Sequence, residues 1–213
     1  MENKEKYTIS LITDLATVFD VGAREDGIEF IEISPNSEYH FFEPHVDFAN
    51  SLKSKIPAGT KAKVNQYGLW SVNLDNAKYY LDVQSFIPHP FVASTDTGEV
   101  YNLRTLDWYV KTEKVGIIDF LKIDAEGADF KILEGAKDTL ASDKIRYIQF
   151  EYWAGVRKFH DLLSRKYNMY YVREELSLSF LDEDLIQEID LSRIPRGFGG
   201  DIFCVHKNEP FLL

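Results

Sequence analysis

Residues 121–127 read Leu121-Lys122-Ile123-Asp124-Ala125-Glu126-Gly127 and follow an apolar run that begins at Ile117. A strand in the middle of a parallel sheet is covered on both faces and is almost continuously apolar. Lys122 and Asp124 interrupt the run, and burial of an unpaired charge is costly. In open α/β sheets, ligands bind outside the carboxyl ends of the strands. The stretch therefore predicts a buried strand with a ligand site at its end, unless Lys122 and Asp124 only neutralise one another.

Strands and helices alternate on both sides of this stretch. Apolar runs of strand length lie near residues 17–22, 39–43, 62–64, 145–151, 170–172 and 201–205. Apolar residues recur at helical spacing near residues 9–15, 48–56, 105–110, 130–140 and 156–163. The alternation predicts a doubly wound, mostly parallel α/β sheet. Residues 70–103 do not follow it, and we interpret them as a hairpin-type insertion.

Length and composition narrow the class of protein. The 213 residues are expected to form one domain, residues 1–213, because two α/β domains would each be small. A net charge of −11 offers no general attraction to phosphate backbones or anionic lipid, so we expect no nucleic-acid partner and no membrane partner. The single cysteine, Cys204, excludes an internal disulfide framework and suits a reducing compartment. Without a visible signal peptide or apolar span, a cytoplasmic protein is expected.

Four predicted strands end in acidic residues, namely Asp20, Glu43, Asp124 and Glu151. If the first five strands of the sheet lie in the order 3-2-1-4-5, these residues form a row along one carboxyl edge. Ordinary loop acids would explain any one of them. Four in succession, with Lys122 among them, favour a functional site in the crevice at that edge.

The turn after the first strand distinguishes between ligands. It reads Gly22-Ala23-Arg24-Glu25-Asp26-Gly27, and Arg24 stands where the dinucleotide fingerprint has its second glycine. A side chain at that position disfavours a bound diphosphate. Glu43, 21 residues after Gly22, is placed to accept hydrogen bonds from both hydroxyls of a ribose. A ribose without a pyrophosphate points to S-adenosylmethionine as cofactor, with capping of the following helix as the alternative role of Glu43.

These segments together resemble the FkbM family of S-adenosylmethionine-dependent methyltransferases. The resemblance covers roughly residues 17–153, and its most specific part is the Lys-Ile-Asp-x-Glu-Gly block at residues 122–127. It is carried by Val18-Phe19-Asp20-Val21-Gly22-Ala23, Phe42-Glu43-Pro44, Leu106-Asp107-Trp108-Tyr109, residues 121–127 and Ile132-Leu133-Glu134-Gly135-Ala136. The family implies a class I methyltransferase, Rossmann-like fold with a seven-stranded sheet whose last strand is antiparallel. It also implies O-methylation of a hydroxyl on a sugar, glycan or natural product.

The resemblance also assigns residues. Asp20, Gly22 and Ala23 match the cofactor loop, Glu43 matches the ribose acid, and Asp124 and Glu126 match the acids after the fourth strand. The family commonly has Asn at the position of Arg24 and a glycine at that of Asp26, and Gly27 is displaced by one. The expected cofactor-binding set is Asp20, Gly22, Ala23, Arg24, Glu43 and, in the turn after the third strand, Gly68.

Methyl transfer to a hydroxyl requires a positioned acceptor whose proton is removed or delocalised. Asp124 is the first candidate for this role and Glu151 the second, while Lys122 is expected to tune either carboxylate by charge pairing. His89, in the insertion, is a less favoured base. The acids have no recognisable ligand spacing, so no metal site is predicted.

Two other functions remain open at this point. The altered cofactor loop is also compatible with a catalytically degenerate methyltransferase fold that serves as a binding or scaffolding module. A nicotinamide-dependent oxidoreductase is the second alternative, and Arg24 argues against it. The expected partner is a small-molecule or glycan acceptor, whose identity the sequence does not specify, and the oligomeric state stays open.

Overall fold

A computed structural model of the chain describes residues 4–80, 96–152, 155–191 and 200–210. The strands of the larger sheet are β1 (Thr17–Val21), β2 (Glu38–Phe42), β3 (Ala62–Asn65), β7 (Ile118–Ile123), β8 (Ile145–Tyr152), β9 (Tyr167–Val172), β10 (Leu178–Phe180) and β11 (Gly200–His206). A smaller sheet contains β4 (Gly68–Leu69), β5 (Leu74–Tyr80) and β6 (Asp96–Arg104). The helices are α1 (Lys4–Ser10), α2 (Glu29–Ile33), α3 (Val46–Lys55), α4 (Leu106–Thr112), α5 (Asp129–Glu134), α6 (Lys137–Ala141), α7 (Arg157–Leu163) and α8 (Glu183–Leu191).

The larger sheet has the order β10-β9-β11-β8-β7-β1-β2-β3. Five adjacent strands of this sheet run parallel to one another, in the spatial order β3-β2-β1-β7-β8. This arrangement confirms the predicted order of the first five strands. Strand β11 lies between β8 and β9 and is antiparallel to both. The sheet has eight strands instead of seven, because the chain turns back after β9 and pairs the three residues of β10 with it. Three residues are too few for a periodic pattern to predict a strand.

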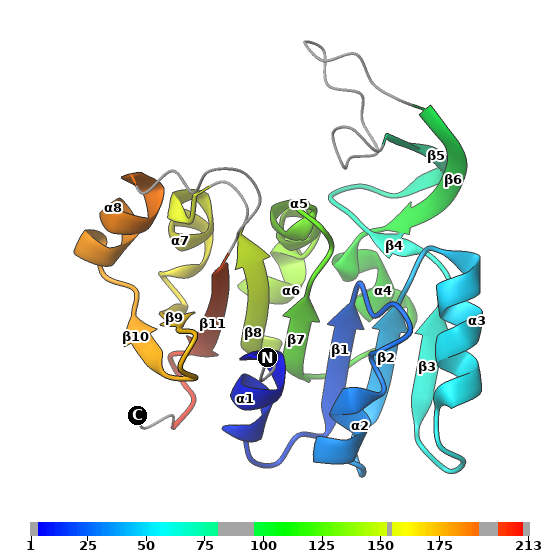
Figure 1. The fold of residues 1–213 in the computed structure, drawn as a ribbon, viewed down its shortest axis with the longest axis horizontal. Helices are drawn as coiled ribbons and strands as arrows, with labels where there is room; N and C mark the ends of the chain where they lie inside the picture. The colour runs from blue at the N-terminus through cyan, green and yellow to red at the C-terminus, as the bar shows by residue number, and fades with distance from the viewer. Residues whose placement is uncertain (1–3, 81–95, 153–154, 192–199, 211–213) are drawn as a thin grey trace.

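Apolar side chains fill both faces of this sheet. On one face Val18 and Phe120 pack with Ile9 of α1 and Phe30 of α2. Their chain neighbours point to the opposite face, where they join the side chains of α4 to α8. Figure 1 shows α1 and α2 in front of the sheet and α4, α5 and α6 behind it. The parallel strands are therefore covered on both sides, and their carboxyl ends form an edge that remains available to a ligand.

The smaller sheet rises beyond this carboxyl edge (Figure 1). Strands β5 and β6 pair antiparallel, which confirms the hairpin-type insertion near residues 70–103. The predicted strand near Tyr79 is seen as far as Tyr80, and residues 81–95, with His89 among them, lie outside the described residues. The insertion therefore stands over the ends of β1 and β2 and supplies a second wall for a site there.

The helical pattern at residues 130–140 is two short helices rather than one. The chain breaks between α5 and α6 at Gly135, where an added Cβ atom would lie 2.1 Å from the backbone oxygen of Trp70. The backbone oxygen of Gly135 also accepts a hydrogen bond from the backbone N–H of Asp107 at 3.0 Å. This close approach fixes α4, α5 and the smaller sheet against one another.

Helix α1 is held against the sheet by polar as well as apolar contacts. The hydroxyl of Thr8 hydrogen-bonds the side-chain oxygen of Gln149 on β8, a residue 141 positions later. Glu5, on the same helix, lies 3.6 Å from Lys122 on β7, between its Oε1 and the lysine Nζ. Within the described residues, no helix is both long and apolar enough to cross a membrane.

Candidate functional site

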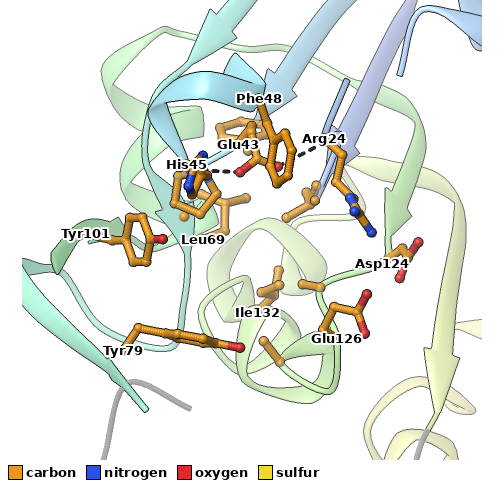
Figure 2. A pocket seen from close by; sticks show the side chains of 17 residues that line it. Arg24, Glu43, His45, Phe48, Leu69, Tyr79, Tyr101, Asp124, Glu126 and Ile132 are labelled. Atoms are coloured by element: carbon orange, nitrogen blue, oxygen red, sulfur yellow. Dashed lines mark hydrogen bonds between the residues drawn. The ribbon is translucent and has the colours of Figure 1, made fainter. Parts of the chain in front are cut away.

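A pocket of about 260 Å³ lies at the carboxyl ends of β1, β2 and β7, beneath the smaller sheet (Figure 2). This volume approaches the lower end of the range for small-molecule sites, about 300 Å³. Most of its lining is apolar, with contributions from Phe42, Leu69 and Ile132. The pocket brings together five of the nine residues predicted for the site: Gly22, Arg24, Glu43, Gly68 and Asp124. Ala23, Asp20, Lys122 and Glu151 do not line it.

Glu43 is fixed at the innermost wall of the pocket. Its Oε2 accepts a hydrogen bond from the backbone N–H of Arg24 at 3.0 Å, and its Oε1 accepts one from that of His45 at 2.8 Å. The residue is only 4 % exposed, and burial raises the pKa of its carboxyl while the two N–H donors oppose the rise. Since His45 caps α3, Glu43 also supports the start of that helix. A carboxylate has about four acceptor sites, so each oxygen retains capacity for a further donor.

Gly22 allows the first loop to cross directly over the end of β7. Its φ is +79°, and an added Cβ atom would lie 1.9 Å from the backbone oxygen of Asp124. The crossing is held by hydrogen bonds from Gly22 N–H to the oxygen of Phe42 and from Asp124 N–H to that of Val21, each 3.0 Å long. The glycine therefore serves the packing of the two strand ends, and this packing shapes the floor of the pocket.

We expect Gly22→Ala to lower the free energy of unfolding by about 3 kcal/mol, the sum of a left-handed backbone cost and an overpacked contact. Gly59→Ala is the matched control, because Gly59 has a φ of +88° and nothing lies within 4 Å of an added Cβ atom. Chemical denaturation of both variants separates the two costs. Equal losses would show that the contact with Asp124 relaxes without cost.

Lys122 and Asp20 form an ion pair beside the pocket, on the face of the sheet that α1 covers. The Lys122 Nζ lies 3.0 Å from Asp20 Oδ1 and 3.7 Å from Asp124 Oδ2. Burial disfavours the charge of Lys122, but the carboxylates around it, Asp20 first among them, outweigh burial and raise its pKa. Burial also raises the pKa of Asp20, against the attraction of Lys122. Lys122 thus connects Asp124 at the pocket to buried acids under the sheet.

Asp129, which the sequence reasoning missed, lies between the ends of β7 and β8. It is 1 % exposed, its Oδ1 accepts a hydrogen bond from the backbone N–H of Glu151 at 3.3 Å, and its Oδ2 has no hydrogen-bond partner among the described residues. Burial first, and then the nearby charges of Asp124 and Glu151, raise the pKa of Asp129 to about 7. The helical pattern around Asp129 concealed this acid, although it follows Asp124 by five residues and Glu126 by three.

A raised pKa means that folded Asp129 holds its proton more tightly than the unfolded chain does. The free energy of unfolding should therefore fall, on the order of 2–4 kcal/mol in total, as pH rises from about 4 to about 7. Asp129→Asn keeps an acceptor oxygen and cannot titrate, so its curve should lack this fall. Denaturant titrations at several pH values measure both curves. Parallel curves for the two proteins would assign the pH dependence to other groups.

The outer wall of the pocket is aromatic, and the sequence analysis did not predict its residues. Figure 2 shows Tyr79 and Tyr101 reaching into the pocket from β5 and β6, opposite Asp124 and Glu126. His45 packs on Phe48, with ring centroids 4.8 Å apart. The buried Nδ1 atom of His45 has no hydrogen-bond partner within the described part of the chain. The alternating pattern of the hairpin could have indicated which residues face inward, but nothing in the sequence showed where the hairpin stands.

The described residues contain no group of three or more His, Cys, Asp or Glu side chains arranged to hold a metal ion. Asp124, Glu126 and Glu151 therefore do not converge as a cation site in this structure.

The strand order, the antiparallel β11 and the pocket at the carboxyl edge define a class I methyltransferase fold. M. capricolum TrmK, solved with S-adenosylhomocysteine, is similar over 96 % of this chain and 68 % of its own, with 13 % identity and a TM-score of 0.51. The 23S rRNA methyltransferase ErmE is 12 % identical over 100 % of this chain and 71 % of its own, with a TM-score of 0.49. The plantazolicin methyltransferase BpumL, solved with S-adenosylhomocysteine, is 10 % identical over 96 % and 81 %, with a TM-score of 0.48.

A family model described as the methyltransferase FkbM domain matches residues 20–171. The chain therefore belongs to the FkbM methyltransferase family, whose expected cofactor is S-adenosylmethionine. A search of curated proteins finds no match to the chain. The family leaves the nicotinamide-dependent alternative without support.

The pocket fits this cofactor on its own chemistry. The buried carboxylate of Glu43 has acceptor capacity for ribose hydroxyls, and the unpartnered Nδ1 of His45 lies in the same wall. Leu69 and Ile132 supply apolar surface for a purine base. One pocket thus offers apolar side chains for the adenine and a carboxylate for the ribose.

The prediction that the chain has no nucleic-acid partner, which was based on net charge, is wrong. The similar structures include one that is named as a 23S rRNA methyltransferase. A net charge of −11 describes the whole chain and does not report the charge around one pocket.

Proposed function

We propose that the protein transfers the methyl group of S-adenosylmethionine to a hydroxyl oxygen of a sugar, glycan or natural product. The observation that carries this proposal is the position of Asp124. Its side chain is 41 % exposed at the mouth of the pocket whose inner wall holds Glu43. A carboxylate that reaches both the pocket and solvent can meet an acceptor from outside.

The residues proposed to hold the cofactor follow from the pocket walls. Glu43 accepts hydrogen bonds from the ribose hydroxyls, since its two backbone contacts fix both oxygens in place. Gly22 brings the loop close to the end of β7, where a side chain would collide with the backbone. Asp20 and Ala23 act through the shape of the loop and not by contact, because they are buried and do not line the pocket. Gly68 lines the pocket and is proposed to contact the cofactor.

Asp124 is the proposed residue for the acceptor hydroxyl. The cofactor, when bound, supplies an electrophilic methyl group. Asp124 orients the hydroxyl and takes its proton as the oxygen bonds to the methyl carbon and the carbon–sulfur bond breaks. The Nζ atom of Lys122 lies 3.7 Å from Asp124 Oδ2 and helps to hold the side chain of Asp124 in position. Glu151, at the end of β8, remains the second candidate.

The test is a screen with labelled methyl donor against hydroxylated sugars, glycans and phenolic natural products, with an RNA pool as a further arm. The expected result is a labelled product whose methyl group survives mild alkali, as an ether does and an ester does not. Label in RNA alone would replace the proposed acceptor class. Firm binding of S-adenosylhomocysteine without transfer to any acceptor would favour the scaffolding function. That alternative arose because Arg24 stands where the family commonly has Asn.

A further inference from the structure

Arg24 is a cation at the pocket that the proposed chemistry has not used. It belongs to the loop after β1, it is exposed, and its side chain lines the pocket. Figure 2 shows the side chain extending across the open side of the pocket toward Asp124. Its guanidinium lies 5.3 Å from the centre of the Phe48 ring, a cation–π contact that leaves the N–H groups at its edge available.

No carboxylate of the described residues lies within ion-pair distance of this guanidinium. Three of the other described arginines are paired with carboxylates: Arg104 with Asp75, Arg146 with Asp119 and Glu209, and Arg157 with Glu183. An arginine that is unpaired by protein carboxylates and lies at a pocket is available to a ligand anion, for which its planar group is well shaped.

The backbone of Arg24 is fixed although its side chain is free to extend. Its φ is +45°, an unusual value for a residue with a side chain. The backbone N–H donates to Oε2 of Glu43 at 3.0 Å, so the residue proposed for the ribose also holds Arg24 in place. The side chain of Arg24 therefore starts from a fixed backbone position next to the proposed ribose site. It extends from there toward the end of β7.

The charges of the pocket fit the ammonium and the carboxylate of the cofactor tail. S-adenosylmethionine carries an ammonium, a sulfonium and one carboxylate. Glu126 lines the same pocket and suits the ammonium, whereas Arg24 is the cation of the lining that suits the carboxylate. The opposite end of the pocket, with Leu69 and Ile132, suits the base.

We propose that the guanidinium of Arg24 binds the carboxylate of the cofactor's methionyl group and so selects a cofactor that retains this carboxylate. The inference rests on the proposed cofactor contacts of the same pocket. The arginine at position 24 of this chain is then not a defect of the cofactor loop. It replaces backbone contacts to the tail with a charged side chain.

The test compares two probes by calorimetry. S-adenosylhomocysteine carries the carboxylate, and its decarboxylated form keeps the adenosine, the thioether and the amine. Arg24→Gln should lower the affinity for S-adenosylhomocysteine by about tenfold or more. It should change the affinity for the decarboxylated probe by less than about threefold. Arg24→Lys should retain part of the selectivity. Lys53→Gln, the same charge change on the exposed face of α3, should alter neither affinity.

Equal losses for both probes, or no loss for either, would overturn the role of Arg24 while the cofactor site stands. A wild-type protein that binds neither probe would remove the cofactor site itself, and the inference with it. Since the Arg24 side chain is exposed, the variant should unfold at the wild-type temperature, and a circular-dichroism melt checks this.

Discussion

Glu43→Ala should weaken the binding of S-adenosylhomocysteine by about 10²- to 10⁴-fold, because two hydrogen bonds to a charged group contribute about 1.5–3 kcal/mol each. The same substitution leaves the backbone N–H groups of Arg24 and His45 without their acceptor. The loop after β1 and the start of α3 should therefore loosen, and the free energy of unfolding should fall by about 1–3 kcal/mol. Calorimetry measures the first effect and chemical denaturation the second.

Glu43→Gln and Glu38→Ala separate these effects. Gln keeps one acceptor oxygen, so it should lose less stability than Ala and still lose most of the affinity. Glu38 lies at the other end of β2, with 57 % of its side chain exposed, and its removal should leave the affinity unchanged. An affinity that survives Glu43→Ala would place the ribose elsewhere and withdraw the contacts proposed for this wall.

Asp124→Asn should lower turnover by about 10²-fold while the affinity for S-adenosylhomocysteine stays within a few-fold, because a loss of this size is typical when general acid–base assistance is removed. Asn keeps the shape of the side chain and a hydrogen-bonding oxygen but cannot take the proton. Single-turnover methyl transfer at saturating cofactor, with an acceptor found in the screen, gives the comparison.

Glu126→Gln is the control for charge alone. Glu126 lines the same pocket two residues later and carries the same charge, so a general electrostatic effect would lower turnover in both variants. The proposed role of Asp124 requires a loss in Asp124→Asn that is much the larger. Unchanged turnover in Asp124→Asn would make Asp124 structural, and Glu151 would be the next residue to test.

The order of the parallel strands could be predicted because burial on both faces leaves a strong signal. The runs around Phe19, Phe41 and Leu121 are mostly apolar and carry acids at or near their carboxyl ends, which indicates both their type and the edge where their charges gather. The break at Gly135 could not be predicted, since its cause is the backbone of Trp70, a residue 65 positions away in the sequence. Strand β10 was missed because three residues carry too little pattern.

The site was only partly predictable for a related reason. Gly22, Glu43 and Asp124 meet at the pocket because they end strands whose order was predicted. Side-chain direction decided the rest: Lys122 alternates to the face under α1, although it stands next to residues that point elsewhere. Tyr79 and Tyr101 reach the pocket through the placement of a hairpin, which depends on tertiary packing and leaves no periodic signal.

The attachment of α1 constrains the order in which the chain assembles. Thr8 finds its partner at Gln149, and Glu5 faces Lys122, so the first helix binds strands that follow it by more than 100 residues. A segment with such distant partners cannot dock before β7 and β8 are paired, because closing so long a loop costs entropy that the later contacts must offset. The lysine under the sheet is thus expected to remain hydrated until late in folding, and α1 is expected to be the last layer added over it.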